Sequence, residues 1–127
     1  MSMSNYLEDK LLNLVLRNTA FTSPTATYLA LYTSDPGEAD AGTEVTGGAY
    51  ARQAIVFGAP SNNTVSNSST IAFPVATAAW GTVAYVGIRD AVTGGNLLFS
   101  AAVGTSQAVG VNNQVIFNAG QITVNLD

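Results

Sequence analysis

The residues best suited to chemistry are four carboxylates that crowd one loop, Asp35, Glu38, Asp40 and Glu44. Oxygen ligands of this type suit Ca²⁺, and a pair of carboxylates can act in glycoside hydrolysis. Their spacing is not that of an EF-hand loop. The third alternative is a solvated acidic loop that keeps the surface soluble. Any metal site in this chain would therefore involve these four residues.

The remaining inventory argues against an enzyme. Histidine and cysteine are absent, which removes the usual general base, thiol nucleophile and transition-metal ligands. Lys10 is the only lysine and lies near no serine motif, and the sequence contains neither a P-loop nor a dinucleotide fingerprint. We expect no catalytic activity and no cofactor.

Aromatic side chains offer a different kind of site. Sugars stack on exposed rings, so Trp80 or Tyr50 could form a receptor platform. Both residues lie in segments of alternating polarity, however, and rings at such positions also pack in cores or interfaces. The sequence leaves both interpretations open.

The elements that must position these residues begin with one helix, over about residues 4–17. Ser4 or Asn5 can cap it, and Asn5 with Glu8 fits a capping box. An apolar stripe follows helical spacing, and Arg17 falls in the expected last turn. The stripe either covers one end of a β core or docks onto another subunit. It consists of Leu7, Leu11, Leu14 and Val15. With the aromatic candidates, the predicted interaction residues are Leu7, Leu11, Tyr50 and Trp80.

Short strands are predicted from about residue 28 onward. The turn Thr93–Asn96, with its two glycines, is a strong hairpin signal. Turns recur every 8 to 12 residues, which favours a mainly β fold: an antiparallel β-sandwich or a jelly-roll-like barrel with one short N-terminal helix. The 127 residues fit one domain, 1–127. The predicted strands are 28–33, 49–57, one near 65, 70–73, 80–90, 97–103, 114–118 and 121–126.

Charge is scarce and unevenly placed. Charged residues make up 9% of the chain, against roughly 25% in ordinary soluble domains, and nine of the twelve lie before residue 53. A neutral hydroxyl and amide surface costs less to desolvate than an ionic one, which favours assembly with neighbouring proteins. The net charge of −4 and the lack of clustered Lys and Arg exclude phosphate-mediated nucleic-acid binding and an electrostatic membrane anchor.

Several segments, in this order, resemble a known family. They are Tyr28–Gly37, Gly47–Gln53, Trp80–Val83, Thr93–Leu98 and Ile122–Leu126. Together they are similar to short tailed-bacteriophage virion proteins, commonly labelled tail-fibre-like or decoration proteins. The resemblance covers nearly the whole chain. It implies a structural component of the particle and supplies no catalytic residues.

We expect a virion protein made in the cytoplasm of the host bacterium. The favoured role is a capsid cement or decoration subunit that binds the assembled shell and stabilises it by mass action. The alternative is a tail, baseplate or tail-fibre-associated protein that contacts the host receptor. The expected partners are other copies of the chain, as a homotrimer, and the major capsid protein or tail proteins.

Overall fold

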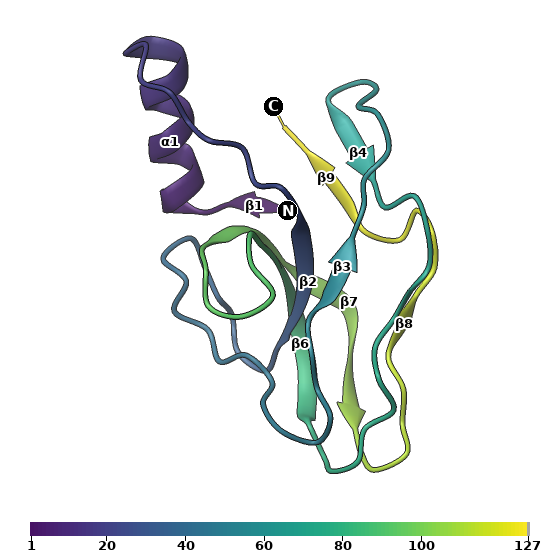
Figure 1. Cartoon of the computed structure of the whole chain (residues 1–127). Helices are drawn as coiled ribbons and strands as arrows, with labels where there is room; N and C mark the ends of the chain where they lie inside the picture. Colours follow the sequence, from purple (N-terminus) through teal and green to yellow (C-terminus); the bar gives the residue numbers. More distant parts are fainter. Residues whose placement is uncertain (127) are drawn as a thin grey trace.

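A computed structural model describes residues 1–126, and its one helix, α1 (Asn5–Leu16), stands at the edge of a β body (Figure 1). Ser4 is the N-cap, because its Oγ accepts a hydrogen bond of 3.2 Å from the Leu7 amide. The predicted capping box at Asn5 is therefore wrong. Arg17 is the C-cap rather than a last-turn residue, and Asn18 leaves the helix with a φ of 53°. Within residues 1–126 no helix is both long and apolar enough to cross a membrane.

The main sheet has five antiparallel strands. Strands β6 (Gly81–Arg89) and β7 (Leu97–Val109) are neighbours and form the predicted hairpin, which pairs Ile88 with Phe99. Strand β7 runs well past the predicted end at Val103, because a bulge between Val83 and Tyr85 shifts the register and lets pairing continue to Val109. In spatial order the strands are β1 (Ser2–Met3), β7 (Leu97–Val109), β6 (Gly81–Arg89), β2 (Thr27–Tyr32) and β3 (Gln53–Ile55).

A second, less regular layer lies beside this sheet and is built by two distant segments. Residues 63–76 run antiparallel to 112–126, pairing β4 (Thr64–Ser66) with β9 (Thr123–Asn125) and β5 (Ile71–Ala72) with β8 (Ile116–Phe117). Backbone hydrogen bonds continue the pairing at both ends, from Leu126 to Asn63 and from Ala76 to Asn113. The result is a mainly β, antiparallel, sandwich-like fold with one helix, as the sequence predicted.

The core lies between the two layers, because alternate residues of β2 and β6 share one face of the sheet and the apolar side chains on that face pack with those of β4, β5, β8 and β9. Leu29 and Leu31 lie on this face. The alternate residues Ala30 and Tyr32 lie on the opposite face of the sheet and are also buried. That opposite face is covered by loop 33–48, which follows β2 directly (Figure 1).

The segment 49–57 departs from the predicted regular strand. Only Gln53–Ile55 pairs as a strand, because Gly47, Gly48 and Ala49 all have positive φ and turn the chain before it. This turn rotates the alternation, so the ring of Tyr50 packs against the same core as Ile55, while Val56 is exposed. A regular strand over 49–57 would place Tyr50 and Val56 on one face, and the structure separates them.

Candidate interaction surfaces

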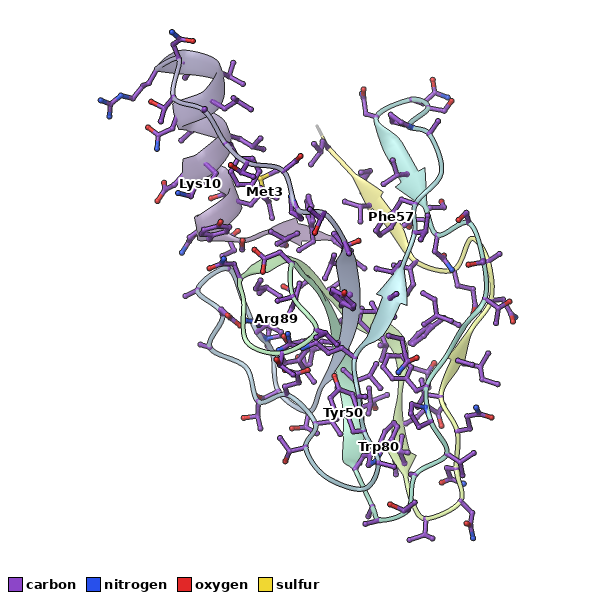
Figure 2. The ribbon with its side chains drawn as sticks, viewed as in Figure 1. Met3, Lys10, Tyr50, Phe57, Trp80 and Arg89 are labelled. Carbon is purple, nitrogen blue, oxygen red and sulfur yellow. The ribbon has the colours of Figure 1, made fainter. Side chains whose placement is uncertain are left out.

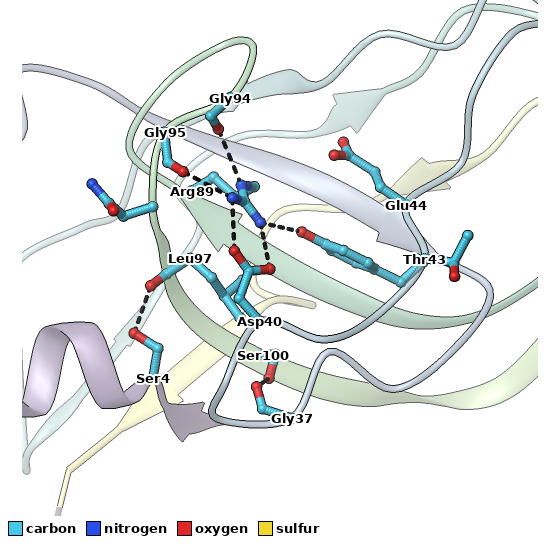
Figure 3. Close-up of polar contacts among 12 residues, drawn as sticks. Ser4, Gly37, Asp40, Thr43, Glu44, Arg89, Gly94, Gly95, Leu97 and Ser100 are labelled. Carbon is cyan, nitrogen blue, oxygen red and sulfur yellow. Dashed lines mark hydrogen bonds and ion pairs between the residues drawn. The ribbon is translucent and has the colours of Figure 1, made fainter.

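The first polar feature is an ion pair that holds loop 33–48 to the sheet. Arg89, on β6, binds Asp40 with two parallel hydrogen bonds of 2.8 and 2.9 Å. The same guanidinium donates to the hydroxyl of Tyr32 at 2.9 Å and to the carbonyls of Gly94 and Gly95 (Figure 3). The Arg89 side chain is only 9% exposed. Bidentate geometry of this kind is directional, so the pair fixes where the loop lies.

A second ion pair anchors the other end of the loop. Arg52 binds both carboxylate oxygens of Glu44, at 2.7 and 2.8 Å. The Tyr50 hydroxyl donates to the same carboxylate at 2.7 Å and accepts a hydrogen bond from the Leu31 amide. Glu44 thereby connects the loop to strand β2 and to the core.

These contacts shift the protonation equilibria of the groups involved. Burial raises the pKa of Glu44, but the hydrogen bonds from Arg52 and Tyr50 outweigh it, so the pKa lies below its ordinary value. Burial and the hydrogen bond to Glu44 raise the pKa of the Tyr50 hydroxyl well above its ordinary value. At neutral pH the carboxylate is therefore charged and the phenol is neutral.

The two arginines share one target. Both donate to the Gly94 carbonyl, in the turn of the β6–β7 hairpin, and Arg52 also donates to Ala91. Asp90 closes the same turn, with its two oxygens accepting from the amide and side chain of Asn96. Two of the chain's three arginines are thus used internally, which leaves the surface around this turn without a free guanidinium.

The predicted acidic site is not formed. Asp40 and Glu44 are each paired with an arginine, and Asp35 accepts a hydrogen bond from the Gly37 amide in its own turn. The side chain of Glu38 is exposed. Across residues 1–126 no three acidic side chains come close enough to hold a metal ion. The four residues proposed as calcium ligands are therefore not brought together in this structure, since two of them fasten the loop to the sheet.

The aromatic candidates lie inside the molecule. Tyr50 stacks on Phe73 with ring centres 6.1 Å apart, and Trp80 meets both rings edge-on. Figure 2 shows Tyr50 and Trp80 near each other in the β body. The Trp80 indole N–H donates to the Gly48 carbonyl at 2.8 Å, and this side chain is 5% exposed. These rings form an aromatic cluster within the core, as the packing interpretation proposed. The prediction that Trp80 forms an exposed platform for a partner or a sugar is therefore wrong.

The helix divides into a covered and an uncovered half. Leu7 is buried and Leu11 is partly buried against the core, so the inner half of the stripe covers one end of the β body. Leu7, which was predicted to contact another subunit, is instead buried within its own chain. The helix extends past the sheet, which leaves Val15 73% exposed.

Sequence reasoning missed the exposed group at the end of the helix. Leu12 and Leu16, which lie off the predicted stripe, are 55% and 73% exposed. With Val15 they form one apolar surface, which we call the helix tip (Leu12, Val15 and Leu16). Their spacing of three and four residues was readable in the sequence, but which side of the helix stays uncovered depends on where the sheet ends.

These features define a small antiparallel β-sandwich-like protein whose two ion pairs fasten one of its own loops and whose helix ends in an exposed apolar surface. A family model described as "Podophage GP4 fiber I protein gp80" matches residues 2–125, and the chain belongs to this family. The match confirms the resemblance to virion proteins of short-tailed phages, at the level of a tail-fibre-like component of the particle. Among curated proteins, none matches the sequence.

Proposed function

We propose that the chain is a non-enzymatic structural module of the phage fibre, which acts by binding other proteins of the tail. The observation that supports this role is the family match over residues 2–125, whose description names a fibre protein. The internal use of the ionic groups agrees with it. Asp40 and Glu44, the carboxylates nearest to a catalytic arrangement, are each bound by an arginine and are not free to act on a substrate.

The fibre role differs from the capsid cement role that the sequence favoured. A cement subunit would bind across the assembled shell, whereas a fibre module would lie at the tail. Nothing in the molecule's geometry selects the shell, so the cement role stays a prediction. The family description is the main support for the fibre role, and the location of the protein on the particle tests it.

The experiment is to label the protein on intact particles of the phage that encodes it. A gold-conjugated antibody against the purified chain, viewed by electron microscopy, should mark the tail end of the particle. Particles pre-incubated with free antigen give the matched control and should lose the label. Gold distributed over the capsid shell would overturn the proposal in favour of cement.

A further inference from the structure

The middle of loop 33–48 is tied to the rest of the molecule by few polar contacts. Pro36 and Val45, on either side of it, are buried, whereas most of segment 37–42 is exposed. Among residues 1–126, three polar links join this segment to other elements. They run from Asp40 to Arg89 on β6, from the Glu38 carbonyl to the Asn5 amide at the start of α1, and from the Gly37 carbonyl to the Ser100 hydroxyl on β7.

The link from Asp40 is the strongest of the three. It consists of two parallel bonds between charged groups, and the Arg89 side chain is only 9% exposed. The other two links are single neutral hydrogen bonds, and the one to Ser100 is 3.4 Å long. The ion pair therefore sets the position of segment 37–42 and, with it, the position of the Glu38 carbonyl.

The helix depends on that carbonyl in its first turn, because the first amides of an α-helix have no partner within the helix. The Asn5 amide donates to the Glu38 carbonyl at 2.9 Å. On the other side, Ser4 donates from its amide and from its hydroxyl to two carbonyls of β7. Figure 3 shows Ser4 and Asp40 on the same side of the sheet as these bonds. The start of α1 is thus held between β7 and segment 37–42.

Beyond its first two turns the helix has little else to hold it. Leu7 is buried and Leu11 is partly buried, but the three residues of the helix tip are each more than half exposed. A helix of 12 residues is marginal in water on its own. Release of its start from the β body would therefore expose the amides of the whole helix to solvent.

We infer that the Asp40–Arg89 ion pair controls the docking of the N-terminal helix: when the pair opens, segment 37–42 and α1 are released from the β body together, while the two layers stay paired. A hollow of about 350 Å³ separates the helix start, residues 38–40 and the end of the β6–β7 hairpin, so polar links rather than dense packing connect them. The pairs β4–β9 and β5–β8 include no residue of the loop or the helix. Local opening of this kind is common in folded proteins.

The experiment compares amide hydrogen exchange, followed by mass spectrometry, in the wild-type chain and in Asp40→Asn. Asp40 has a φ of 56°, and asparagine tolerates this left-handed conformation, so the substitution removes the charge and keeps the backbone. Exchange should become at least about tenfold faster in segment 37–42 and about three- to tenfold faster in α1. Exchange in the paired strands β4 and β9 should not change.

Two further variants make the test specific. Glu44→Gln is the matched control, because it breaks the other ion pair of the same loop, which has no link to the helix; exchange in α1 should stay at the wild-type rate. Ser4→Ala removes a bond between the helix start and β7. Because coupling between two sites is reciprocal, this variant should accelerate exchange in segment 37–42.

Three results would overturn the inference. The first is helix exchange in Asp40→Asn that equals that of the wild type. The second is an increase of equal size in every segment, since global destabilisation requires no coupling between the ion pair and the helix. The third is a helix that Glu44→Gln loosens as much as Asp40→Asn does. None of these measurements depends on where the protein lies on the particle, so they are independent of the labelling experiment.

Discussion

The hydroxyl of Tyr50 donates a hydrogen bond of 2.7 Å to Oε2 of Glu44, and this contact joins the aromatic cluster of the core to the ion pair that fixes loop 33–48. The same hydroxyl accepts a bond of 3.0 Å from the Leu31 amide on β2. One hydroxyl therefore accepts from the amide of a buried strand residue and donates to a partly buried carboxylate. The ring anchors in the core while its polar end organises the loop.

Replacing Tyr50 with Phe should lower the free energy of unfolding by about 1–3 kcal/mol, because the buried Leu31 amide and Glu44 both lose a partner while the ring packing stays. Urea unfolding followed by the fluorescence of Trp80, the only tryptophan, measures this change. Tyr85→Phe is the matched control, since no hydrogen bond of the Tyr85 hydroxyl occurs among residues 1–126, and it should change stability little. Equal effects from the two substitutions would contradict the bridging role of Tyr50.

Acid should destabilise the fold through Glu44 and Asp90. Their folded-state pKa values lie below the ordinary values of 4.5 and 3.8, because hydrogen bonds from Arg52 and Asn96 outweigh the effect of burial. The unfolded chain therefore binds more protons as the pH falls through this range. Stability should be full above about pH 5 and should fall progressively as the pH drops through the lowered folded-state values.

Glu44→Gln separates this linkage from general acid effects. The variant keeps the shape of the side chain but cannot gain a proton, so it should be less stable than wild type at pH 7 and lose less stability between pH 5 and pH 3. Thermal unfolding at half-unit pH steps tests both expectations. An acid profile parallel to that of the wild type would show that Glu44 does not contribute to it.

Calcium should leave the thermal midpoint unchanged. A bound ion stabilises the folded state more the more tightly it binds, but Asp40 and Glu44 are held by Arg89 and Arg52. Differential scanning calorimetry with millimolar calcium, against the same protein in a chelator, measures the shift. A rise in the midpoint that Asp40→Asn removes would restore the acidic loop as a calcium site.

A side chain at position 87 should destabilise the fold. A Cβ added there would lie 2.8 Å from Leu97 Cδ1 and 2.8 Å from Tyr32 Cε2, in the closely packed space between β6 and loop 33–48. Gly87→Ala should therefore cost about 1–3 kcal/mol of unfolding free energy. Gly104→Ala is the control, because an added Cβ meets nothing within 4 Å there, and its effect should stay within about 0.5 kcal/mol. Chemical denaturation of both variants and of the wild type measures the two changes in unfolding free energy, and equal changes would contradict the close packing at Gly87.

Local signals in the sequence predicted several elements well. The helix from about residue 4 follows from a capping serine and helical apolar spacing, and the hairpin follows from Gly94 and Gly95, which both adopt positive φ. Elements such as these depend on contacts between residues close in the chain. The segment 49–57 was predicted less well, because three consecutive positive-φ residues reset its alternation, and a non-glycine member, Ala49, gave no warning.

The candidate site was harder to predict because its partners are distant in the sequence. The acidic loop indicated calcium or catalysis because the sequence does not show that Asp40 and Glu44 are each paired with an arginine. Asp40 meets Arg89 across 49 residues. The charged pair Arg89-Asp90 gave no hint of its role, since one member faces the loop and the other caps its own hairpin.

The sequence by itself determined the mainly β class, the single N-terminal helix, the scarcity of charge and the family, because each follows from composition, local spacing or the order of motifs. Tertiary structure alone decided that the carboxylates fasten a loop, that Tyr50 and Trp80 pack in the core, and that the helix tip stays bare. The physical reason is that burial and ion pairing depend on which distant segments meet. In this chain, that depends on strand order and on where the sheet ends beneath the helix.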